Sequence, residues 1–187
     1  MLFRSETAAR MAAAFTAGLN EHGIIGCYKH FPGHGDTAED SHSGLAVART
    51  TREEMESCDW LPFREAGMAD FVMVGHIAVP EITGDMTPST LSHQMVTEIL
   101  KGDLGFTGLV ITDAMNMGAI TEGYGPGEAA VAALLAGCDI LLMPDDLPEA
   151  FEAVLAALED GTLTMEWLDT TVYRILEFKK LHGILDF

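Results

Sequence analysis

Residues 29–42 read KHFPGHGDTAEDSH and directly follow the apolar run 24–28. The run predicts a buried strand, and a strand that ends in such a loop delivers polar side chains to one point. The loop holds three histidines, two aspartates and a lysine. Its two glycines allow a tight turn, and Pro32 stiffens the exit from the strand. We therefore expect the chemistry of the protein at this loop.

The rest of the chain repeats the same pattern, a continuous apolar strand followed by a helix. Such alternation is typical of a parallel sheet covered by helices. The strands are expected at 24–30, 70–75, 109–112 and 139–143, and the helices at 5–19, from 51, at 91–101, at 128–136, at 148–158 and from 164. All four strands end in ionisable residues, namely Lys29 and His30, His76, Asp113, and Asp145 with Asp146. Because ligands bind at the carboxyl ends of parallel strands, these ends predict an active-site face.

The spacing of the strands indicates only part of a closed barrel. The expected strands recur about every 38 residues, so an eight-unit barrel would need roughly 300 residues, and the chain has 187. We therefore predict an α/β fold with a single domain over residues 1–187, a half TIM-type (β/α) barrel of four parallel strands and covering helices. Bare strand edges and an uncovered sheet face are unfavourable in water, so we expect oligomerisation to complete the sheet.

Composition narrows the choice of partners. The formal net charge of −19 argues against nucleic acid or an anionic membrane as the main partner. Three cysteines without CxxC spacing favour free thiols in a reducing compartment, and the charged N-terminus does not resemble a signal peptide. No apolar run reaches the ~18 residues of a membrane helix. A cytoplasmic location is the expectation.

The motifs resemble the family 3 glycoside hydrolases, specifically their β-N-acetylglucosaminidase branch. Residues 29–37 with Asp40-Ser41-His42 carry the most specific match, and residues 111–117, ITDAMNM, resemble the strand end that holds the family's nucleophile. Residues 75–77 and 141–144 also resemble strand ends of that family. The resemblance covers nearly the whole chain and implies the C-terminal half of the catalytic barrel. This sequence has no match to the first strands of the family's barrel. It also has no match to an aspartate in that region that binds sugar hydroxyls.

The resemblance implies a retaining, double-displacement mechanism. Asp113 is the expected nucleophile, because a retaining glycosidase needs a carboxylate beneath the anomeric carbon. His42 is the expected general acid and base, since imidazole titrates near neutral pH, and Asp40 is expected to orient it. Two alternatives stay open: an aspartate after a strand also serves as a helix N-cap, and a loop histidine can simply face solvent.

Three further residues are expected to bind substrate. The resemblance gives this role to Lys29 and His30, and a lysine supplies three hydrogen-bond donors to oxygen-rich sugars. The alternative for Lys29 is a salt bridge in the barrel mouth. His76 is a weaker candidate, because a strand-end histidine is as often structural as catalytic. His34 and Asp36 are expected to hold the shape of the loop.

No metal or other cofactor is expected. The histidines and aspartates of the loop would suit zinc, but His30 and His34 share a face only on a helix, which Pro32-Gly33 prevents. We expect a glycosidase of the β-N-acetylhexosaminidase type that acts on amino-sugar glycosides as a homodimer or higher homo-oligomer. The alternative is a catalytically weak or inactive half-barrel scaffold that keeps the motif without a complete sugar pocket. A third option is phosphorolysis through the histidine.

Overall fold

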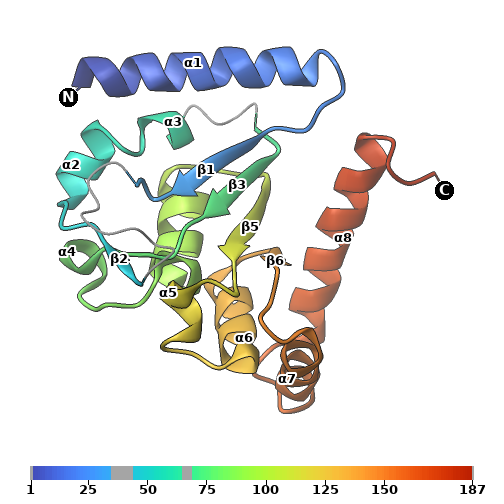
Figure 1. The fold of residues 1–187 in the computed structure, drawn as a ribbon. Coiled ribbons are helices and arrows are strands. Elements are labelled where there is room, and N and C mark those ends of the chain that lie inside the picture. Colours follow the sequence, from blue (N-terminus) through green and yellow to red (C-terminus); the bar gives the residue numbers. More distant parts are fainter. Residues whose placement is uncertain (1, 35–43, 65–68, 187) are drawn as a thin grey trace.

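The structure, a computed structural model, describes residues 2–34, 44–64 and 69–186 (Figure 1). Strands and helices alternate along most of this length. The strands are β1 (Cys27–Phe31), β2 (Ala46–Val47), β3 (Phe71–Val74), β4 (Ile77–Ala78), β5 (Leu109–Ala114) and β6 (Ile140–Leu142). The α-helices are α1 (Leu2–Asn20), α2 (Arg52–Ser57), α3 (Leu61–Arg64), α4 (Pro80–Thr83), α5 (Gly118–Thr121), α6 (Pro126–Ala136), α7 (Leu147–Glu159) and α8 (Met165–Leu181). A 3₁₀ turn, η2 (Ser89–Leu91), and a π-helix, η3 (Gln94–Asp103), complete them.

The main sheet has four strands in the order β1-β3-β5-β6, and every neighbouring pair is parallel. This is the fold class expected from the sequence. The two faces of the sheet differ in exposure. Tyr28, Val72 and Val110 lie in register and are buried, whereas Met73 and Ile111, one residue further along β3 and β5, are half-buried. The second face therefore lacks the dense cover of the first.

Helices pack against the first face of the sheet. One continuous core joins this face to η3 and α6. In Figure 1, α1 lies beside β1, while α6 and α7 lie side by side below β5 and β6. The two outer strands of the sheet, β1 and β6, are thus at opposite ends of the layer.

Several boundaries differ from the sequence expectations. The first strand begins at Cys27 rather than at residue 24, because the backbone pairs with β3 only from that point. A short parallel pair, β2 with β4, lies outside the main sheet and was not expected. The segment 115–127, between the expected strand at 109–112 and the expected helix at 128–136, contains α5 and the first two residues of α6. The helix expected at 91–101 is the π-helix η3.

Local signals explain the helices that were expected. Thr51 and Glu54 form a capping box at the start of α2, and Asp146 and Thr164 cap α7 and α8 through their side-chain oxygens. Gly137 ends α6 with a φ of 109°, which disfavours other residues. A Cβ there would also overlap the Thr97 hydroxyl oxygen. None of the helices in the described ranges is long and apolar enough to cross a membrane.

A buried carboxylate fixes α8 to the start of β6. The Asp139 side chain is 3% exposed and accepts hydrogen bonds from Arg174 at 2.6 Å and from the Val110 N–H at 2.8 Å. Lys101 lies 3.4 Å from the same carboxylate, and burial lowers the pKa of this lysine while the carboxylate opposes the shift. Arg174 also donates to the Gly108 carbonyl. One aspartate therefore links η3, β5 and α8.

We expect Asp139→Ala to lower the free energy of unfolding by about 3 kcal/mol, because two partly buried cations lose their counter-charge. Urea unfolding measures this change. Glu152→Ala, at an exposed position of α7, is the matched control and should stay within about 0.5 kcal/mol of the parent. Equal effects of the two substitutions would contradict the structural role of Asp139.

Candidate active site

The polar ends of β1 and β5 meet at the carboxyl end of the sheet. His30 Nε2 lies 3.6 Å from Asp113 Oδ2, and the two side chains are 26% and 17% exposed. A carboxylate and an imidazole thus face each other there. Both remain accessible from solvent, so a substrate could reach either.

The second oxygen of Asp113 is held by its own backbone. Oδ1 accepts a hydrogen bond from the Ala114 N–H at 2.8 Å. The peptide that follows is tied to β6, because the Met115 N–H donates to the Leu142 carbonyl at 2.8 Å. The Leu142 N–H in turn donates to the Thr112 hydroxyl. The tip of β5 is therefore fixed in place, which suits a nucleophile that must hold its position.

His76 is buried in the interior, whereas a side chain that binds substrate would be exposed at the site. It is 1% exposed, and both ring nitrogens are used inside the protein: Nδ1 lies 2.8 Å from the Thr90 hydroxyl and Nε2 lies 3.0 Å from the Ala114 carbonyl. Burial lowers the pKa of His76, although the Ala114 carbonyl and the Asp113 charge oppose the shift. A side chain without a free donor or exposed surface cannot hydrogen-bond a sugar. Our expectation that His76 binds substrate is therefore corrected.

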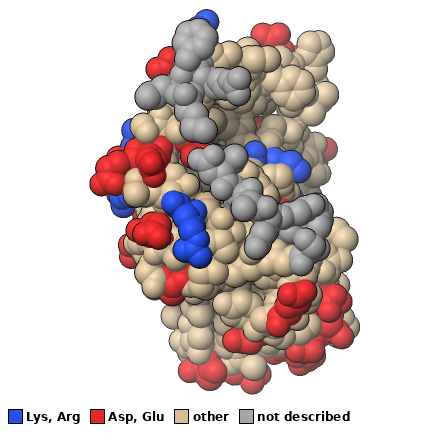
Figure 2. Space-filling view, turned by 60° about the vertical axis from the view of Figure 1, so that its left-hand side comes forward, with Lys and Arg blue, Asp and Glu red and all other residues tan. Residues whose placement is uncertain are grey.

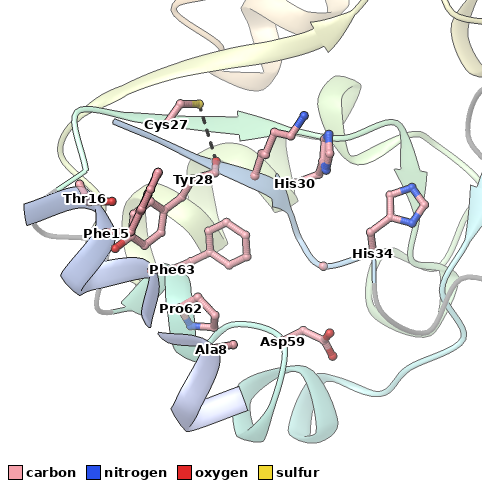
Figure 3. Close-up of a pocket in the computed structure, with 13 residues that line it drawn as sticks. Ala8, Phe15, Thr16, Cys27, Tyr28, His30, His34, Asp59, Pro62 and Phe63 are labelled. Atoms are coloured by element: carbon pink, nitrogen blue, oxygen red, sulfur yellow. Dashed lines mark hydrogen bonds between the residues drawn. The ribbon is translucent and has the colours of Figure 1, made fainter. Parts of the chain in front are cut away.

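A pocket of about 390 Å³ lies between α1, β1 and α3 (Figure 3). His30 and His34 lie at one end of it, and Phe15, Tyr28 and Phe63 gather at the other. The pocket is thus polar beside the end of β1 and apolar beneath α1. The Tyr28 hydroxyl is buried and has no hydrogen-bond partner among the described residues.

The remaining expected residues fall into three groups. Lys29 is exposed on β1 and lines the pocket. His34 also lines the pocket, with its ring centroid 5.9 Å from that of His30. Asp146 caps α7 rather than facing the site. The expected acid/base pair, Asp40 and His42, and the loop residue Asp36 lie outside the described residues.

Sequence reasoning missed two parts of the site. Thr90, from η2, is buried against His76, and Asp59 lines the pocket close to Gly33. Neither follows a strand, so no sequence pattern pointed to them. Within the described ranges, no three His, Cys, Asp or Glu side chains are placed to hold a metal ion.

Four parallel strands, helices on one face and a carboxylate at a strand tip define the class of protein: the chain is part of a (β/α) barrel. Residues 4–178 match the N-terminal domain of glycosyl hydrolase family 3. The chain therefore belongs to this family.

Individual relatives agree with this assignment. Beta-hexosaminidase A of Pseudoalteromonas piscicida is 35% identical over 179 residues, which cover 84% of this chain and 30% of that protein. A beta-hexosaminidase of Alkalilimnicola ehrlichii is 38% identical over 159 residues, which cover 84% of this chain and 45% of that protein.

Solved structures give the same result. A family 3 beta-N-acetylglucosaminidase from Paenibacillus superposes with a TM-score of 0.92 at 38% identity, over 96% of this chain and 35% of that one. A beta-glucoside phosphorylase superposes with a TM-score of 0.90 at 29% identity, over 96% of this chain and 34% of that one. The chain thus spans less than half the length of these relatives.

Proposed function

We propose that the chain carries the nucleophile side of the active site of a retaining β-N-acetylglucosaminidase. The observation that supports this most is the fixed Asp113 carboxylate at the tip of β5, 3.6 Å from His30. Beta-hexosaminidases and beta-N-acetylglucosaminidases among the relatives supply the substrate class, an amino-sugar glycoside.

The proposed reaction has two steps. Asp113 attacks the anomeric carbon and forms a glycosyl ester, while the bond to the aglycone breaks and His42 gives its proton to the leaving oxygen. Water then attacks the same carbon, His42 takes a proton from that water, and the ester bond to Asp113 breaks. Asp40 would orient the His42 ring, and Lys29 and His30 would hydrogen-bond the sugar hydroxyls.

A complete sugar pocket needs more walls than this chain supplies. The half-buried face of the sheet, the outer strands β1 and β6, and the pocket beneath α1 are all places where further polypeptide could pack. We propose that a second copy fills them. A two-fold axis along the strand direction would join β1 of each copy to β6 of the other and keep every strand parallel.

The direct test is release of nitrophenol from an aryl β-N-acetylglucosaminide by the purified chain. Turnover that rises more steeply than protein concentration at low concentration supports both the activity and its dependence on a second copy. Absence of turnover at every concentration favours the inactive scaffold instead.

Phosphorolysis is the second candidate, because a beta-glucoside phosphorylase is among the similar structures and a histidine acid/base repels a phosphate acceptor less than a carboxylate would. Adding phosphate to the same assay separates the two reactions. A sugar 1-phosphate product identifies phosphorolysis, and the free sugar identifies hydrolysis.

We expect the chain to sediment at micromolar concentration with about twice the 20.1 kDa mass of one copy. Carboxylates gather at the lower end of the molecule, around α6 and α7 (Figure 2). Because each copy carries a net charge of −19, the copies repel one another, and raising the salt from about 0.05 to about 0.5 M should tighten the dimer. A monomer at both salt concentrations would contradict the proposed pairing.

A further inference from the structure

The buried histidine after β3 lies at the centre of a line of hydrogen bonds that ends on Asp113. Thr90 contacts Nδ1 of His76, Nε2 of His76 contacts the Ala114 carbonyl, and the Ala114 N–H donates to Asp113 Oδ1. Distances along this line are 2.8, 3.0 and 2.8 Å. The line therefore runs from the buried turn η2 to the candidate nucleophile.

The Ala114 carbonyl determines which ring nitrogen of His76 must carry a proton. A carbonyl oxygen only accepts, so the Ala114 carbonyl requires a proton on Nε2 of His76. Burial lowers the pKa of His76 and so favours the neutral ring, in which Nδ1 is an acceptor. The single proton of the Thr90 hydroxyl is then shared between Nδ1 and the Gly75 carbonyl, which lies 2.9 Å from the Thr90 oxygen. The Asp113 carboxylate acts on the ring electrostatically and opposes the lowering of its pKa by burial.

The peptide group between Ala114 and Met115 is thereby held from both sides. Its carbonyl, on Ala114, accepts from His76 at the end of β3, and its N–H, on Met115, donates to the Leu142 carbonyl of β6. With the carbonyl released, this peptide could rotate. The backbone of Ala114 would then be free to shift, and with it the Ala114 N–H that holds Asp113 Oδ1.

We propose that His76 is a positioning residue, which orients the Asp113 carboxylate toward His30 by holding the Ala114 carbonyl through its Nε2–H. His76 touches no substrate and acts only through the backbone. This role rests on the proposed function in one respect, that Asp113 is the reacting group. The hydrogen bond by which His76 holds the Ala114 carbonyl does not depend on that function.

Two variants of similar length separate the hydrogen bond from the packing. His76→Gln keeps a donor near the position of Nε2, whereas His76→Met removes it. His93→Gln, at an exposed histidine beside Glu98, is the surface control. Thermal unfolding of each variant confirms that the comparison is made on folded protein.

The first measurement needs no activity. Nitrogen NMR at pH 7 should show His76 neutral with its proton on Nε2, and amide hydrogen exchange at Ala114 and Met115 should be about tenfold faster in His76→Met than in the parent. In His76→Gln and His93→Gln, exchange should stay near the parent rate. A ring without a proton on Nε2, or equal exchange in all variants, would overturn the proposal. If His76→Met does not fold, the protonation of Nε2 in the parent protein and the exchange rates of His76→Gln still test the proposal.

The second measurement uses the active protein. His76→Met should lower kcat by about 10- to 100-fold with little change in KM, because a misplaced nucleophile slows chemistry more than binding. His76→Gln should recover most of that loss. Unchanged kcat in His76→Met would overturn the positioning role. If the parent chain is inactive, the proposed function fails. The NMR and exchange results still test whether His76 holds the Ala114 carbonyl.

Discussion

Asp113→Asn should lower kcat for an aryl β-N-acetylglucosaminide by at least about 1,000-fold. The amide cannot form the glycosyl ester, because it lacks the negative charge that traps the developing oxocarbenium centre. The rate of nitrophenol release at saturating substrate measures the loss. The substitution is nearly isosteric, so the effect reports on chemistry rather than on packing.

The local structure should survive this substitution. The side-chain carbonyl of the introduced asparagine can still accept from the Ala114 N–H, as Asp113 Oδ1 does now. Asp169→Asn is the matched control, since Asp169 is an exposed carboxylate on α8 and does not follow a strand. It should keep activity within about twofold of the parent. Retention of more than about a tenth of the activity in Asp113→Asn would assign the nucleophile to another residue.

His42→Ala should give the second largest loss, about 100- to 10,000-fold for substrates with a poor leaving group. Without a proton donor, the aglycone oxygen must leave as an anion. The rate of the first step should therefore fall much less for a nitrophenyl glycoside, whose aglycone leaves readily, than for an alkyl glycoside. Comparing pre-steady-state release of the two aglycones measures this difference.

The partner of His42 gives a graded version of the same test. Asp40→Asn should reduce the rate less than His42→Ala, because the imidazole remains and loses only its orienting charge. Asp36→Asn, in the same loop, is the control for a role in loop shape. An equal loss for nitrophenyl and alkyl substrates in His42→Ala would contradict its role as the general acid.

The sequence predicted the sheet well because its strands are buried and strongly apolar. Val72, Val74 and Val110 belong to continuous apolar runs, and such runs bounded by turn residues specify parallel strands. The π-helix η3 could not be predicted in the same way. Its apolar side chains also fit an ordinary helical pattern, and only packing in three dimensions selects the wider turn.

The candidate site was predictable in part. Asp113 and His30 follow apolar strands, so the position of each at a strand tip could be expected, and their separation of 3.6 Å agrees with strand tips that share one edge of the sheet. The role of His76 could not be inferred, because a histidine after a strand can point outward or inward. Its partner Thr90 lies 14 residues further along the chain, on a turn that no periodic pattern marks.

The measurement that tests the central proposal most directly is mass spectrometry of the chain after reaction with a fluorinated N-acetylglucosaminyl fluoride. The ring fluorine slows hydrolysis of the glycosyl ester, so the covalent intermediate should accumulate. We expect one added sugar per site, on the peptide that contains Asp113, and no label in Asp113→Asn. A label on a different residue, or equal labelling of the parent and Asp113→Asn, would contradict the assignment of Asp113 as the nucleophile.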